Sequence, residues 1–128
     1  IEGVLRHHVE EAIAGLEPFD ITLERPTRAD DNYIVMELSE GADRFCLVHD
    51  RLYSGMLAPH LSKVHSYRPH VTVGHLSPSE DPDAATAHAL DVLPRPLSGR
   101  VDAVAAFRLD YPWRGEVVFT LPLGNRGR

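Results

Sequence analysis

Two polar residues near the middle of the chain are of types that could do chemistry together. His70 and Thr72 belong to the segment Tyr67-Arg68-Pro69-His70-Val71-Thr72-Val73-Gly74. Its valines favour a strand, where alternate residues share a face. His70 and Thr72 are then expected side by side, with Val71 and Val73 pointing into the core. Because an imidazole exchanges protons near neutral pH and a hydroxyl can donate to a phosphate oxygen, the pair indicates phosphoester chemistry.

The residues that flank this pair fit a strand that presents it. Pro69 is tolerated at the start of a strand, where its missing N–H matters little, and Gly74 permits a bulge or a close backbone approach. Tyr67 and Arg68 are candidates for binding substrate, because a guanidinium suits the geometry of a phosphate. An anchoring role at the start of the strand explains Tyr67 and Arg68 equally well.

Hydrophobic periodicity gives the elements that must position the pair. The spacing predicts helices over 3–16, 43–58 and 82–93, with Asp43 and Asp81 as N-caps. Alternation predicts strands over 19–25, 33–39, 70–76, 99–110 and 116–123. Residues 26–32 and 112–115 are predicted to be loops. Helices and hairpin-connected strands mix without regular βαβ alternation, so we expect an α+β fold with largely antiparallel sheets.

Composition narrows the class of protein. The chain has 128 residues, 43% of them hydrophobic, which suits one compact domain, 1–128. A formal net charge of −6 argues against broad binding of duplex DNA, which usually requires a basic face. No apolar run is long enough to cross a membrane. The lone Cys46 cannot form an internal disulfide and fits a reducing, cytoplasmic location.

The segment around His70 resembles the second His-x-Thr motif of the 2H phosphoesterases, a group that includes 2′-5′ RNA ligase-like proteins and cyclic phosphodiesterases. The resemblance extends along the chain through the order of the elements and the ending Leu121-Pro122-Leu123-Gly124. It implies a two-lobed α+β fold in which each lobe contributes one His-x-[Ser/Thr] strand. The implied reactions are cleavage of cyclic phosphates and making or breaking 2′-5′ RNA linkages, with no metal or other cofactor.

The resemblance also implies a second half-site. The first motif of this family precedes a helix like 3–16, and the printed chain starts at Ile1 with that helix. We therefore expect the domain to be N-terminally incomplete here, with the partner of His70 upstream. An internal look-alike, Asp20-Ile21-Thr22-Leu23, has Asp where His belongs, and its polar face is explained by solvent.

Two further groups of residues invite a functional interpretation. Histidines recur every five residues, at His60, His65, His70 and His75, which matches neither helix nor strand periodicity and so argues against a shared metal site. Trp113 could stack on a base, but packing across its hairpin is preferred.

Three functions follow from these residues. The first is an enzyme acting on a small nucleotide or RNA-end phosphate, with His70 and Thr72 as catalytic residues and Tyr67 and Arg68 as substrate-binding residues. The second is a non-catalytic phosphate- or nucleotide-binding module that keeps one half-site. The third is an interaction domain in which the motif is coincidental. The sequence favours no particular oligomeric state.

Overall fold

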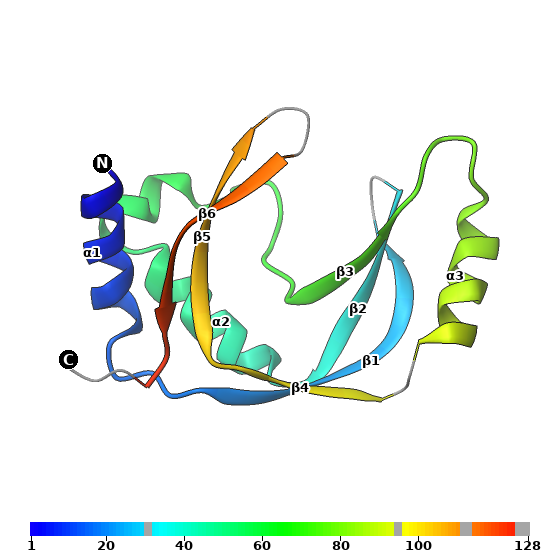
Figure 1. The fold of residues 1–128 in the computed structure, drawn as a ribbon, viewed down its shortest axis with the longest axis horizontal. Coiled ribbons are helices and arrows are strands. Elements are labelled where there is room, and N and C mark those ends of the chain that lie inside the picture. The colour runs from blue at the N-terminus through cyan, green and yellow to red at the C-terminus, as the bar shows by residue number, and fades with distance from the viewer. Residues whose placement is uncertain (30–31, 94–95, 111–113, 125–128) are drawn as a thin grey trace. The chain divides into compact units, whose positions relative to one another are not determined.

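The computed structural model of the chain describes residues 1–29, 32–93, 96–110 and 114–124 (Figure 1). None of the helices in these residues is long and apolar enough to cross a membrane. In chain order the elements are α1 (Glu2–Ile13), β1 (Phe19–Ala29), β2 (Tyr33–Glu40), α2 (Ala42–Leu52), the 3₁₀ helix η2 (Gly55–His60), β3 (His70–His75), α3 (Pro82–Val92), β4 (Leu97–Val101), β5 (Ala103–Asp110) and β6 (Arg114–Pro122).

The chain divides into two compact units. The first unit consists of Ile1–Phe19, Leu47–Ser66 and Arg100–Arg128, and contains α1, β5 and β6. The second unit consists of Asp20–Cys46 and Tyr67–Gly99, and contains β2, β3 and α3. The strand pairings determined for both units are antiparallel. The expected two-lobed α+β architecture is therefore confirmed.

The second unit is built on a sheet in which β2 is an inner strand. The sheet order is β3-β2-β1-β4, so β2 is hydrogen-bonded on both sides. Alternation of polar and apolar residues correctly predicted this strand over 33–39. The structure adds that Ile34, Val35 and Met36 are all buried, with 3%, 4% and 1% of their surface exposed. Burial of consecutive residues means that both faces of β2 are covered, and β2 forms the core of this unit.

β1 is longer than predicted. The predicted polar loop over 26–32 is wrong for its first part, because β1 continues to Ala29 and pairs with β2 there. The register shifts between Leu23 and Pro26, and Pro26 is fully buried after this irregularity. A proline is accepted in a strand at such an irregularity, where a ladder hydrogen bond is already missing. Residues 30–31 of the predicted loop lie outside the described part of the chain.

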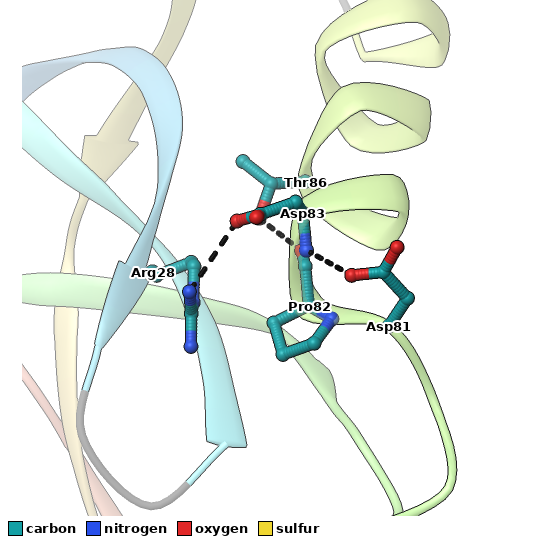
Figure 2. A network of polar contacts seen from close by, with 5 residues as sticks. All are labelled: Arg28, Asp81, Pro82, Asp83 and Thr86. Carbon is teal, nitrogen blue, oxygen red and sulfur yellow. Dashed lines mark hydrogen bonds and ion pairs between the residues drawn. The ribbon is translucent and has the colours of Figure 1, made fainter.

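Helix α3 begins as predicted, at an aspartate cap. The Asp81 carboxylate accepts a hydrogen bond from the backbone N–H of Asp83 at 3.0 Å, and Pro82 occupies the first turn. The Asp83 carboxylate also forms an ion pair with the Arg28 guanidinium of β1 at 3.3 Å (Figure 2). The Thr86 hydroxyl donates to the Pro82 carbonyl at 2.8 Å. Of these contacts, the exposed Arg28–Asp83 ion pair ties the start of α3 to the sheet.

The first unit packs α1 against the β5–β6 ribbon. Val9 and Ile13 of α1 are buried, as are Phe119 and Leu121 of β6, and the Arg6 guanidinium lies over the Phe119 ring. Figure 1 shows α1 beside this ribbon. The helix was predicted to run to residue 16 but ends at Ile13. The chain turns at Gly15, whose φ of +79° is a conformation that favours glycine.

The strand predicted over 99–110 is two strands. β4 ends at Val101 and β5 begins at Ala103, and the Asp102 carbonyl between them accepts a hydrogen bond from the N–H of Leu123 at 2.8 Å. The apolar face predicted for the distal half of the ribbon is exposed, since Phe107, Leu109 and Val117 have about half or more of their surface in solvent. β6 also includes residues 114–115, which were predicted to be loop.

The helix predicted over 43–58 is likewise divided. α2 spans Ala42–Leu52, so Asp43 lies in its first turn and is not the N-cap. Gly41, with a φ of +94°, precedes the helix, and its carbonyl accepts from the N–H groups of Arg44 and Phe45. A Cβ at Gly41 would approach Ile21 Cγ2 to 2.7 Å, so glycine is required there. After α2 the chain continues in η2, with the Ser54 hydroxyl donating to the Arg51 carbonyl.

Candidate functional site

β3 carries the His70–Thr72 pair at the end of the sheet order in the second unit. The strand begins at His70, as the sequence predicted. His70 is opposite Glu37 and Thr72 is opposite Val35 on β2. Directly opposed residues of an antiparallel pair share a face, so His70, Thr72 and Glu37 project from the same side of the sheet. Both His70 and Thr72 are exposed, and a ligand can reach them from solvent.

A backbone hydrogen bond sets the chemistry of the His70 ring. Its Nδ1 lies 2.7 Å from the carbonyl oxygen of Arg68. A carbonyl can only accept, so Nδ1 must carry the proton. In the neutral ring the lone pair is then on Nε2, the nitrogen that points away from this contact. His70 is thereby prepared to take a proton at Nε2, or to give one from Nε2 when the ring is charged.

Pro69 explains why this contact forms within three consecutive residues. The proline ring fixes its own φ near −65° and restricts the residue before it to extended conformations. Arg68 and His70 are the residues on either side of it. The carbonyl of Arg68 and the ring of His70 are therefore joined through a stiff link. Pro69 precedes β3, consistent with the tolerance predicted from the sequence.

The β2–β3 register contains the bulge that Gly74 suggested. Ile34 is opposite Gly74 and Val35 is opposite Thr72, which leaves Val73 as the extra residue on β3. A close backbone approach at Gly74 is not observed, because a Cβ there would meet Ile34 at an ordinary distance of 3.7 Å. The bulge separates the His70–Thr72 pair from His75, which stacks on Tyr33 with ring centroids 4.5 Å apart.

The prediction that Val71 and Val73 point into the core is wrong. They have 38% and 40% of their surface exposed. The physical reason is the position of β3 at the end of the sheet order, together with an open contact to α3, which buries none of its own residues. A cavity of about 240 Å³ lies between Val73 and Gly74 on β3 and Ala85 and Ala89 on α3. The face opposite His70 is thus only half covered.

Arg68 and Tyr67 lie just before β3. The Arg68 guanidinium forms an ion pair with the carboxylate of Glu37 on β2. Tyr67 has 42% of its surface exposed. Sequence reasoning missed Glu37, although strand alternation already placed it on the polar face of 33–39. The pairing of Glu37 with His70 and Arg68 depends on the β2–β3 register, which no local pattern gives.

Other residues considered from the sequence make local structural contacts or lie outside the described residues. The Thr22 hydroxyl donates to the Glu40 carboxylate at 2.8 Å, a structural contact between β1 and β2. His60 is the last residue of η2, and the Ser62 hydroxyl oxygen accepts a hydrogen bond from the His65 N–H at 3.2 Å within a turn. Trp113 lies outside the described residues.

The structure also shows where the histidines and the single cysteine of the chain lie. Within residues 1–29, 32–93, 96–110 and 114–124, no group of three or more His, Cys, Asp or Glu side chains could hold a metal ion. His60 and His65 belong to the first unit, and His70 and His75 belong to the second. Cys46 is a free, half-buried cysteine of α2. These placements leave the His70–Thr72 pair as the candidate for chemistry in the described chain.

The loop that follows β3 carries the one carboxyl group in the described chain with a clearly shifted pKa. The backbone N–H of Ser77 donates to the Glu80 carboxylate at 2.9 Å. This bond lowers the pKa of Glu80, with further lowering by the Ser77 side chain and by the nearby His75. Hydrogen bonds to the charged form favour ionisation. Glu80 therefore orders the turn that follows β3.

Comparison with known families matches residues 3–111 to the 2′-5′ RNA ligase superfamily. No curated protein matches the chain significantly. The family match includes nearly all of α1, the strands β2 and β3, α3 and the whole His70 segment. It agrees with the resemblance of this segment to a 2H phosphoesterase motif. The chain belongs to the 2′-5′ RNA ligase superfamily, within the 2H phosphoesterases.

Proposed function

We propose that this protein is a phosphoesterase of the 2′-5′ RNA ligase-like 2H type, which does acid–base chemistry on a nucleotide cyclic phosphate or an RNA-end phosphodiester. The observation that carries the proposal is the hydrogen bond from His70 Nδ1 to the Arg68 carbonyl, 2.7 Å long. It leaves Nε2 as the nitrogen that exchanges protons, on an exposed strand beside a threonine hydroxyl. Membership of the superfamily supports the reaction class.

In the hydrolytic direction the reaction consists of one displacement at phosphorus. A base takes a proton from water as the water oxygen attacks, the P–O bond to one ribose oxygen breaks, and an acid protonates that oxygen. His70 would serve in one of these two roles through Nε2. The family resemblance assigns the other role to a second His-x-[Ser/Thr] unit. The proposed chemistry uses no metal or other cofactor.

Thr72 would hold the phosphate during this displacement. Its hydroxyl shares a face with His70 and is exposed, so it can donate to a non-bridging oxygen. Hydrogen bonds to charged groups are stronger than neutral ones, which favours a phosphate that carries negative charge. Arg68 and Tyr67 would contact the phosphate or the attached nucleoside from the residues that precede β3.

The composition supports a small ligand over a long nucleic acid. A net charge of −6 disfavours the broad backbone contacts that duplex DNA requires. A nucleotide or a single RNA end needs only the local contacts described above. The lone Cys46 supports a reducing, cytoplasmic location, where disulfides are rare.

The test compares His70→Ala with a matched histidine variant in the full-length protein. Substrates would be a 2′,3′-cyclic nucleotide and a short RNA that ends in a 2′,3′-cyclic phosphate, with products separated by chromatography. We expect His70→Ala to lower turnover by at least about 100-fold, the lower range for loss of a general acid or base. His65 is an exposed histidine between η2 and β3, and His65→Ala should keep full activity.

Three outcomes would contradict the enzyme proposal. Turnover that survives in His70→Ala would remove His70 from the reaction. Saturable nucleotide binding that is lost in Thr72→Ala, with no product formed by the parent protein, would identify a binding module that retains one half-site. Chemical shifts of His70 that phosphate and nucleotides leave unchanged would favour a coincidental motif in an interaction domain.

A further inference from the structure

Glu37 is a charged residue on the site face that the reaction described above does not use. It lies on β2 directly opposite His70, and its carboxylate forms an ion pair with Arg68. Arg68 is also the residue whose carbonyl accepts from His70 Nδ1. Glu37 thus contacts the side chain of Arg68, and the main-chain carbonyl of Arg68 orients His70.

Arg68 requires a contact of this kind to fix its position, because it precedes β3. β3 begins at His70, so Arg68 lies outside the hydrogen-bonded ladder that fixes the residues of β3. Pro69 stiffens the link to His70 but leaves the position of Arg68 relative to β2 undetermined. The ion pair with Glu37 supplies that missing restraint. Any movement of the Arg68 carbonyl would weaken its bond to Nδ1 and release the imidazole ring.

The ion pair is placed for positioning more than for stability. The side chains of Arg68 and Glu37 are 71% and 48% exposed. Exposed ion pairs contribute little to the free energy of unfolding because water screens both charges. Its geometric effect is larger, since a misplacement of about 1 Å at a reacting group can lower a rate by about 100-fold.

We propose that Glu37 is a positioning residue, which holds Arg68 so that the Arg68 carbonyl keeps His70 in the Nδ1–H tautomer. Its catalytic consequence rests on the proposed phosphoesterase function, while its effect on the tautomer does not. The free imidazole prefers the other tautomer, with the proton on Nε2, and in that form His70 could not accept a proton at Nε2. Glu37 therefore acts on the reaction through Arg68 without touching the substrate.

The first experiment measures the tautomer directly. Nitrogen-15 NMR of the neutral histidine rings distinguishes Nδ1–H from Nε2–H in the full-length protein. We expect His70 to be mainly Nδ1–H in the parent and to shift toward Nε2–H in Glu37→Ala. Arg68→Ala keeps the backbone carbonyl that accepts from His70 Nδ1. A similar tautomer shift is therefore expected in this variant only if the ion pair between the Arg68 and Glu37 side chains holds that carbonyl in place. The double variant should shift no further than either single variant.

Glu40→Ala is the matched control. Glu40 is an exposed carboxylate on the same strand, on the opposite face by alternation, and it accepts a bond from Thr22 at 2.8 Å. Its removal deletes one charge and one side-chain contact of β2, as Glu37→Ala does. We expect the His70 tautomer and the turnover of Glu40→Ala to match the parent. A shift of equal size in both variants would overturn the proposal, because any loss of charge on β2 would then suffice.

The second experiment measures turnover of a 2′,3′-cyclic nucleotide. We expect Glu37→Ala to lower kcat about tenfold while KM stays the same or falls, since Arg68 remains available to meet the phosphate. An unchanged tautomer or an unchanged kcat would overturn the positioning role. If His70→Ala still abolishes activity in that case, the proposed function stands without it. Conversely, a tautomer shift in a protein that turns over no substrate would support the positioning role and contradict the proposed function.

Discussion

β2 and β3 are neighbours in one sheet, yet they differ in burial and in their position within the sheet. Ile34, Val35 and Met36 in the first half of β2 are 4% exposed or less. His70 to Val73 on β3 are all exposed. Adjacent strands are only about 4.8 Å apart, so the two environments are separated by a single hydrogen-bonded ladder. The core of the second unit and its candidate site are therefore supported by the same backbone contacts.

A strand that is exposed to solvent can keep its side chains in a fixed geometry when its neighbour in the sheet is buried. β2 is held by a strand on each side, while β3 is last in the sheet order and buries little. β3 takes its geometry from β2 through the register that places Glu37 opposite His70. Substitutions in β2 should thus affect stability first, and substitutions in β3 should affect activity first.

The largest effect on stability is expected from Met36→Ala. Met36 is 1% exposed, and removing a buried side chain of this size leaves a cavity. We expect a loss of about 2–5 kcal/mol in the free energy of unfolding, measured by chemical denaturation. Val71→Ala is the control, because Val71 is opposite Met36 on β3 and is 38% exposed. A loss in Val71→Ala as large as in Met36→Ala would show that β2 and β3 contribute equally to stability.

A smaller effect is expected from Thr72→Val, which removes a hydroxyl at nearly constant volume. Loss of one hydrogen bond to a charged phosphate should lower kcat/KM by about 10- to 100-fold. Because Thr72 is exposed, the free energy of unfolding should change by less than about 0.5 kcal/mol. Thr27→Val is the matched control, since Thr27 faces Val35 from β1 as Thr72 does from β3. Equal losses of activity would refute a specific role for Thr72.

The smallest effect is expected at Glu80, in the loop after β3. Its pKa is lowered in the folded protein, chiefly by the Ser77 N–H. A group with a lowered folded pKa contributes stability when it is ionised, and that contribution disappears as the pH falls below its ordinary titration range. We expect Glu80→Gln to flatten the acid side of the stability curve slightly, with no change at the site. Carbon-13 NMR titration of the Glu80 carboxyl measures the pKa directly, and an ordinary value would contradict this expectation.

Local sequence patterns predicted the structure correctly where interactions between residues close in the chain determine it. Alternation predicted β2, and the Asp81-Pro82 pair predicted the start of α3, where the carboxylate caps the helix as expected. The spacing of His70 and Thr72 predicted their shared face, because a strand period of two leaves no alternative. The shared face of the two side chains could therefore be predicted from the segment that contains them.

Patterns failed where neighbouring strands override local preference. Pro26 indicates a loop in isolation, but pairing with β2 extends β1 past it. Valines on a strand indicate burial, but Val71 and Val73 lie on a strand with little cover. The pairing of Glu37 with Arg68 joins residues far apart in the chain, so it required the register. In each of these three cases the outcome depends on the residues that lie beside a strand. The sequence of the strand itself does not specify those neighbours.

The position of β3 at the end of the sheet order has a consequence for the behaviour of the protein at high concentration. A strand in that position, with exposed valines, is the kind of template on which a second chain can pair and aggregate. Pro69 cannot donate a hydrogen bond just before this strand, and the bulge at Val73 interrupts its regular edge. We expect these two features to act as gatekeepers against self-association, so that the site segment carries its own protection from fibril-like pairing.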